Sequence, residues 1–185
     1  IGLAHNFAAS TKGRSSVMDY PHPTLSLKDG KIDFTNAYDT KIGDWDKVSI
    51  AYSYSEFKTD EDANLKSILN DAFNNGARFI TDQDARPLGS AHAYAHLWDN
   101  GSDVSVELEN LLLIRKNAIA NFSKDNIKSN QPYSVLEDVF VPLYFLHRYQ
   151  TEGVAKVIGG LDYTYAIKDD GNTIVKRIPG KLERK

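Results

Sequence analysis

Three histidines are the residues with which this sequence could bind a metal. His5 follows Gly2 in a Gly-x-x-His spacing, and His92 and His96 lie four residues apart in the string His-Ala-Tyr-Ala-His. Imidazole is a common zinc ligand, and a hydrolytic zinc site typically combines three protein ligands with a water molecule. Because a Gly-x-x-His spacing is frequent by chance, His5 becomes a convincing candidate only with support from other residues.

That support comes from the single methionine. Met18 lies within Ser-Val-Met-Asp-Tyr at residues 16–20, thirteen residues after His5. The two strings together resemble the metzincin zinc-dependent metalloproteases. In those enzymes a Gly and a third His follow a His-Glu-x-x-His helix, and a Met-turn lies beneath the metal. The run is most similar to a family of large bacterial zinc metalloproteases, and residues 81–85 and 98–103 are similar to that family as well.

The resemblance implies a role for each of these residues. His5 would be the third zinc ligand, and Gly2 would let the chain turn off the preceding helix, because glycine tolerates backbone angles that other residues resist. Met18 would form the floor of the site. Tyr20 would stabilise the oxyanion of the reaction, for which a phenol donor is chemically suited.

The same resemblance implies that the sequence starts just after the His-Glu-x-x-His helix. We therefore expect a C-terminal fragment of a catalytic domain that is inactive alone and binds little or no zinc, although Zn²⁺ is the cofactor of the parent enzyme. The expected partners are a peptide or protein substrate and the upstream part of the same catalytic domain. The family also implies export from a bacterial cell, to the periplasm, the outer surface or the medium.

His92 and His96 form an alternative metal site. On a helix, residues four apart share a face and could bind zinc together. However, an alanine follows His92, so this pair lacks a glutamate base, and a third ligand would have to be Asp99, Asp103 or a more distant group. The other interpretation is that both histidines are hydrogen-bonding residues that precede a helix.

The composition is that of a folded domain. The chain has 41% hydrophobic and 25% charged residues, a formal net charge of −3 and no cysteine. The charge argues against a nucleic-acid partner, and the lack of cysteine excludes disulfides and thiolate metal sites. No stretch approaches the roughly 18–20 apolar residues of a membrane-spanning helix.

The periodicity predicts a mainly α fold with small β elements (α+β). It resembles the helical C-terminal subdomain of a metzincin catalytic domain, with an irregular segment at 1–43 and a helical subdomain with a terminal hairpin at 44–185. Helices are expected at 45–54 after a cap at Asp44, up to 75 after a cap at Thr59 or Asp60, up to 122 after a cap at Ser102 or Asp103, and at 132–152. Extended pieces are expected at 24–27 and 31–34, and a hairpin at 161–178. Since the 132–152 helix is apolar nearly all round, we expect it to be buried.

A rival hypothesis needs no catalysis. The chain could be a helical module that binds protein or glycan, since it has ten Tyr, eight Phe and two Trp. Most of these aromatic residues, however, lie at the spacing of core positions. The sequence that precedes Ile1 in the gene would distinguish the two hypotheses.

Overall fold

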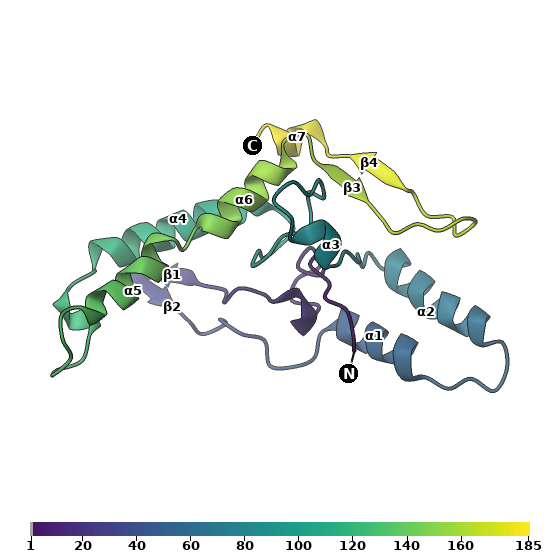
Figure 1. The fold of residues 1–185 in the computed structure, drawn as a ribbon, viewed down its shortest axis with the longest axis horizontal. Helices are drawn as coiled ribbons and strands as arrows, with labels where there is room; N and C mark the ends of the chain where they lie inside the picture. Colours follow the sequence, from purple (N-terminus) through teal and green to yellow (C-terminus); the bar gives the residue numbers. More distant parts are fainter. Residues whose placement is uncertain (1) are drawn as a thin grey trace.

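Helices dominate the computed structural model, which describes residues 2–185 (Figure 1). The elements are the helices α1 (Asp44–Tyr54), α2 (Glu61–Asn74), α3 (Asp82–Ala85), α4 (Val104–Ala120), α5 (Val135–Tyr144), α6 (Arg148–Val157) and α7 (Gly180–Glu183), the short 3-10 helices η1 (Val17–Asp19) and η2 (Lys124–Asn126), and the strands β1 (Ser26–Lys28), β2 (Lys31–Asp33), β3 (Leu161–Tyr163) and β4 (Val175–Arg177). Both sheets in this part of the chain are two-stranded and antiparallel, β1 with β2 and β3 with β4. The predicted fold class is confirmed.

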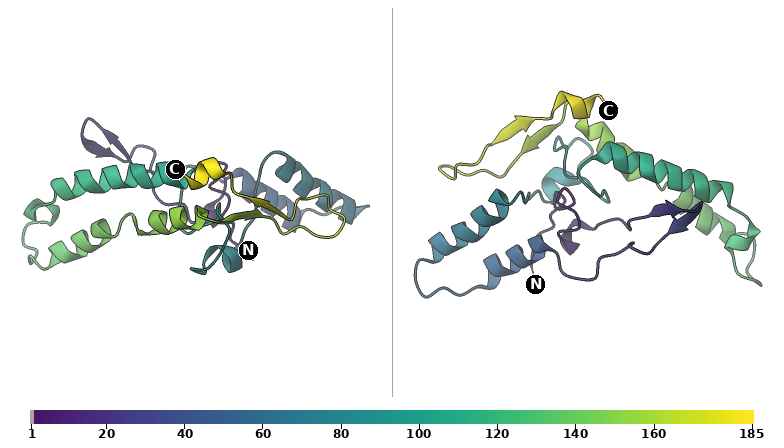
Figure 2. Two further views of the ribbon diagram at one scale, coloured as in Figure 1. Left: turned by 90° about the horizontal axis from the view of Figure 1, so that it is seen from above. Right: turned by 180° about the vertical axis from the view of Figure 1, so that it is seen from behind.

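The elements form two arms around an irregular centre. Figures 1 and 2 show α1 and α2 paired on one side, α4, α5 and α6 on the other, and the β3–β4 hairpin extending over the side of α1 and α2. The β1–β2 hairpin packs against α4, where Asn110 and Asn117 donate side-chain hydrogen bonds to the carbonyls of Leu25 and Gly30. The centre is formed by residues 2–20 and by residues 77–103, which join the arms.

A side-chain cap marks the start of α4. Ser102 and Asp103 are the two predicted caps of α4, and the structure selects Asp103, whose side chain accepts hydrogen bonds from the amides of Ser105 and Val106 at 3.1 and 3.2 Å. Such a cap satisfies amides that have no partner within the helix. Asp44, predicted to cap the helix over 45–54, is instead its first residue, and Gly43 is the cap residue.

The hydrophobic core lies at the centre and is small. One cluster combines Phe7 and Ala8 with Ile80, Ala85 and Ala95, all less than 2% exposed. A second combines Ala93, Val104, Val157 and Ile178. Because the first cluster contains residues next to His5, the candidate ligand is attached to the best-packed part of the fold.

The prediction of one buried helix over 132–152 is wrong. The chain forms α5 and α6 instead, separated at Phe145–His147. Pro142 has no amide hydrogen for the helix, which weakens the end of α5. The described residues of α5 include no buried side chain, and Tyr144 is 48% exposed. The buried contacts come from α6, which packs against α4.

The division of the chain at residue 43 stays a prediction.

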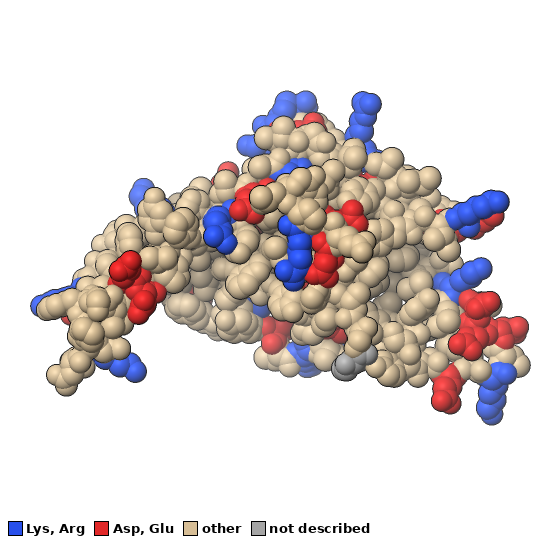
Figure 3. All heavy atoms as spheres, in the orientation of Figure 1, with Lys and Arg blue, Asp and Glu red and all other residues tan. Residues whose placement is uncertain are grey.

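Charges of both signs are interspersed on the face of the molecule shown in Figure 3. None of the helices formed by residues 2–185 combines the length and the apolar character that crossing a bilayer requires.

Candidate metal-ligand site

Main-chain hydrogen bonds hold the segment that carries His5. The amide of Asn6 donates to the carbonyl of Met18 at 3.1 Å, and the amide of Phe7 donates to the carbonyl of Ile80 at 2.8 Å. Phe7 is fully buried. Gly2 has a φ of +80°, in the left-handed region that favours glycine. The backbone of His5 is therefore fixed between the Met18 turn and residues 78–82.

Each ring nitrogen of His5 has a partner. Nδ1 lies 2.8 Å from Oδ2 of Asp82, and Nε2 lies 3.2 Å from the hydroxyl of Tyr20. Burial disfavours the charged form of Asp82, but hydrogen bonds from His5 and Arg86 outweigh it and lower the pKa of that carboxyl. An ionised carboxylate only accepts hydrogen bonds, so Nδ1 carries a proton, and in the neutral imidazole Nε2 is then the nitrogen with the lone pair.

The turn around Met18 is built by side-chain caps. The Ser16 hydroxyl accepts from the amide of Met18 at 2.9 Å and donates to Asp46 at 2.6 Å, and the amide of Val17 donates to Asp46 at 3.1 Å. Tyr20 follows with φ +53° and its side chain is 49% exposed. The first turn of α1 thus holds the turn from which Tyr20 reaches His5.

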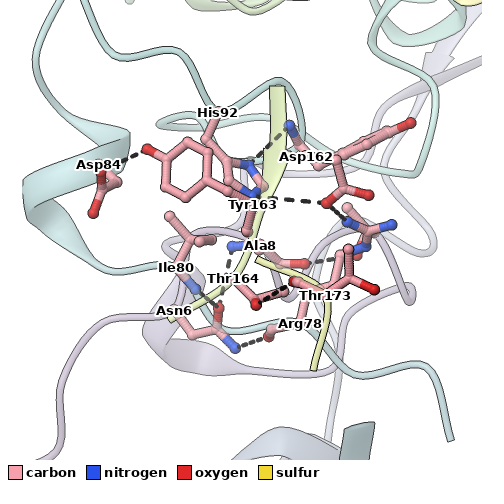
Figure 4. Close-up of polar contacts among 12 residues, drawn as sticks. Asn6, Ala8, Arg78, Ile80, Asp84, His92, Asp162, Tyr163, Thr164 and Thr173 are labelled. Atoms are coloured by element: carbon pink, nitrogen blue, oxygen red, sulfur yellow. Dashed lines mark hydrogen bonds and ion pairs between the residues drawn. The ribbon is translucent and has the colours of Figure 1, made fainter. Parts of the chain in front are cut away.

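Asn6 fastens this region to the next segment (Figure 4). Its fully buried side chain donates to the carbonyl of Arg78 at 2.7 Å and accepts from the amides of Ile80 and Ala8 at 3.2 Å each. These bonds satisfy main-chain groups that would otherwise be buried without partners. The segments that carry His5 and Asp82 therefore form one hydrogen-bonded unit.

Two buried carboxyl groups lie behind the turn. Asp19 and Asp99 are 2% and 4% exposed, and Ser10 joins them, donating from its amide to Asp19 at 2.5 Å and from its hydroxyl to Asp99 at 3.3 Å. Burial raises the pKa of Asp19 to about 7, and burial together with repulsion from Asp19 raises the pKa of Asp99 well above its usual value. Two buried like charges disfavour each other, so the pair retains a proton near neutral pH.

His92 and His96 lie in separate surroundings outside any helix. Nε2 of His92 lies 2.9 Å from the carbonyl of Tyr163, and its Nδ1 accepts from the amide of Tyr94 at 3.2 Å. Burial and the nearby Lys156 lower the pKa of His96 to about 4. Among residues 2–185, Nε2 of His96 finds no hydrogen-bond partner, and it lies 3.6 Å from Glu152. Both nitrogens of His92 are therefore occupied by main-chain bonds, while His96 is a buried neutral base.

A cavity of about 370 Å³ lies between the end of α2 and the β3–β4 hairpin. Arg78 and Asp162 form an ion pair on its wall, as Figure 4 shows. The cavity also borders Tyr163 and Tyr165, whose hydroxyls donate to Asp84. Helix α3 therefore contacts the cavity wall through Asp84, and it contacts His5 through Asp82.

A comparison with protein families identifies the family of this chain. The family model DUF4953, described as Met-zincin, matches residues 1–185. The chain belongs to the Met-zincin family. No curated protein and no solved structure matches it. Membership confirms the metzincin-type resemblance and implies zinc in the complete enzyme and a peptide or protein substrate.

The donor set of this Met-zincin chain fits one ligand of a zinc site. Among residues 2–185, no group of three or more His, Asp or Glu side chains could hold a metal ion. His5 by itself has the features of a ligand: Nδ1 is bound by a carboxylate, Nε2 keeps its lone pair, and the side chain is 25% exposed. A histidine that binds metal usually donates its other N–H to such a partner.

Asp82 is the residue near His5 whose contact with the imidazole the sequence did not predict. It is 77 positions from His5, so no local pattern joins the two. The signal that could have identified it is the similarity of residues 81–85 to the family. Asp46, which organises the Met18 turn from α1, gave no signal beyond its place in the first turn of a helix.

Proposed function

We propose that this Met-zincin chain forms one wall of a zinc-dependent peptidase site and supplies His5 as a zinc ligand. The observation that supports the proposal best is the pair of contacts at the imidazole. Asp82 binds Nδ1 at 2.8 Å, and the lone pair of Nε2 faces the hydroxyl of Tyr20 at 3.2 Å. This combines an oriented nitrogen ligand with a hydrogen-bond donor beside it.

Zinc bound at His5 would supply a water that ionises near neutral pH and would polarise the scissile carbonyl. The residues of this chain hold and surround that centre. His5 binds through Nε2, while the Met18 turn forms the floor and takes no part in the chemistry.

Tyr20 is the proposed donor to the substrate carbonyl oxygen. Nε2 of His5 has one lone pair, so it cannot accept from Tyr20 and bind a metal at the same time. When the metal takes the nitrogen, the phenol is released and can donate elsewhere. Its 49% exposure leaves it accessible to a bound peptide. A donor aimed at the developing oxyanion stabilises the transition state.

The remaining ligands and the general base are proposed to come from outside these 185 residues. The sequence contains no His-Glu-x-x-His, and the general base must lie within hydrogen-bond reach of the water that it deprotonates. One imidazole binds zinc weakly. We therefore expect negligible peptidase activity and little zinc for residues 1–185 alone.

The test uses the intact polypeptide that contains this chain. His5→Ala should lose most of the bound zinc, measured by elemental analysis after dialysis, and at least about 100-fold of the hydrolysis of a labelled protein substrate, in line with the loss of a group that a catalytic site requires. His147→Ala is the matched control, because His147 lies at the start of α6. Full zinc content in a folded His5→Ala protein would overturn the proposal and favour a binding module without catalysis.

A further inference from the structure

We propose that Asp82 is a positioning residue for the metal ligand, fixing the tautomer and the direction of the His5 imidazole. The inference rests on the proposed function, since it concerns how His5 is prepared for zinc. Nothing in the Met18 motif or in the Gly-x-x-His spacing points to Asp82; only the fold brings it to His5.

The carboxylate of Asp82 is held at both oxygens. Oδ2 lies 2.8 Å from Nδ1 of His5 and also accepts from the hydroxyl of Thr81 at 3.3 Å. Oδ1 accepts from Nε of Arg86 at 2.5 Å. A carboxylate bound on both sides cannot rotate freely, so it presents a fixed acceptor to the imidazole before any metal arrives.

Arg86 adds a second constraint. Its guanidinium lies 5.3 Å from the centre of the Phe7 ring, and Phe7 is fully buried beside His5. The ring of Phe7 is in turn 5.5 Å from that of His5. The carboxylate of Asp82 and the ring of Phe7 thus both border the imidazole, and Arg86 contacts both of them.

The chemical consequence is a better nitrogen ligand. With Nδ1–H donated to a carboxylate, the tautomer with a free Nε2 is favoured and the basicity of Nε2 rises. Loss of such a partner typically weakens metal binding about 10–100-fold. Because the backbone of His5 is fixed by separate bonds at Asn6 and Phe7, removal of Asp82 should affect the ring more than the fold.

The same helix provides a matched control. Asp84 lies two residues further along α3, and its oxygens accept from the hydroxyls of Tyr163 and Tyr165 at 2.5 and 2.7 Å rather than from His5. Asp84→Asn removes a carboxylate from α3 without removing the partner of the imidazole. It should lower the thermal stability of the metal-free protein and leave zinc affinity within about threefold, since the carboxylate that accepts from the imidazole stays in place.

The experiment measures the zinc Kd of the intact polypeptide by chelator competition. Asp82→Ala should weaken zinc binding by about 10–100-fold. Asp82→Asn should weaken it less, because an amide oxygen can still accept from Nδ1–H. With Co²⁺ in place of zinc, the visible absorption bands should shift in Asp82→Ala and stay unchanged in Asp84→Asn, which a merely structural role would not produce.

Three outcomes separate the inference from the proposed function. If Asp82→Ala binds zinc as tightly as the unaltered protein while His5→Ala does not, the positioning role is wrong and the proposed function stands. If Asp82→Ala and Asp84→Asn weaken zinc binding equally, the effect belongs to α3 as a whole and the positioning role is again wrong. If His5→Ala retains zinc, the proposed function fails and the inference fails with it.

Discussion

Asp19, a buried carboxyl group, makes the stability of the protein depend on pH. The folded protein raises the pKa of Asp19 from 3.8 to about 7. Between these values the folded state binds more protons than the unfolded chain, so the contribution of Asp19 to stability falls as pH rises from about 4 to about 7. This direction is opposite to that of a carboxylate with a lowered pKa.

We predict that Asp19→Asn removes the part of the loss of stability with rising pH that Asp19 causes. Because an amide does not ionise, the variant should gain stability relative to the unaltered protein by about 2–4 kcal/mol between pH 4 and pH 7. Urea unfolding of both proteins at the two pH values measures the gain. Asp29→Asn, at an exposed position, is the control. A difference between the two proteins that does not change with pH would contradict the prediction.

Tyr20 gives a second prediction for single residues. Tyr20→Phe in the intact polypeptide should keep its zinc, because the phenol is not a ligand, and should lower kcat by about 100-fold, as removal of one oxyanion donor typically does. KM should change little. Steady-state kinetics on a peptide substrate, together with zinc analysis, measure both effects. Unchanged kcat would remove Tyr20 from the reaction.

At the scale of elements, the start of α1 determines the shape of the Met18 turn. Asp46 accepts hydrogen bonds from Gly43, Val17 and the Ser16 hydroxyl. A Cβ at Gly43 would lie 2.0 Å from the carbonyl oxygen of Ser15 and 2.6 Å from the amide nitrogen of Ser16. The close approach of two main-chain segments therefore requires glycine at this position.

We predict that Gly43→Ala lowers stability by about 3 kcal/mol, the upper part of the usual range for overpacking, because the obstructing atoms belong to the backbone. Thermal unfolding measures the loss. Gly89→Ala is the matched control, since a Cβ at Gly89 meets nothing within 4 Å. Equal melting temperatures for the two variants would show that residues 15 and 43 can separate without cost.

The whole molecule exposes more surface than a closed domain of its size. Its accessible area is 12,315 Å², whereas about 8,900 Å² is expected for a monomer of this mass. Apolar side chains on the arm formed by α4, α5 and α6 contribute to the excess. Leu113 of α4 is 59% exposed, and Phe145, which follows α5, is 51% exposed. Such surface favours association.

We predict that residues 1–185 alone associate as their concentration rises. The double variant Leu113→Lys, Phe145→Lys should associate less, because it places charge on the exposed apolar area. Sedimentation velocity over a range of concentrations measures the change. Leu88→Lys is the control, since Leu88 is exposed but lies outside α4 and α5. A chain that stays monomeric at every concentration would contradict this prediction.

What the sequence determined by itself is local. The spacing of Gly2, His5 and Met18 indicated the family. The capping candidates at 102–103 located the start of α4 to within one residue, and the turn residues at 169–172 located the hairpin between β3 and β4. These features depend on hydrogen bonds and backbone angles within a few residues, which a sequence pattern records directly. The helix predicted over 132–152 failed because apolar periodicity does not reveal a break near Pro142 or which helix packs against α4.

Only the tertiary structure decided which distant side chains meet. Asp82 reaches His5 across 77 residues, and Ser10 reaches Asp99 across 89. His92 and His96, close in the sequence, occupy different surroundings because their segment is not a helix. The physical reason is that such pairings follow from the packing of the centre around Phe7 and Ile80, where many weak contacts act together and no single spacing carries the information.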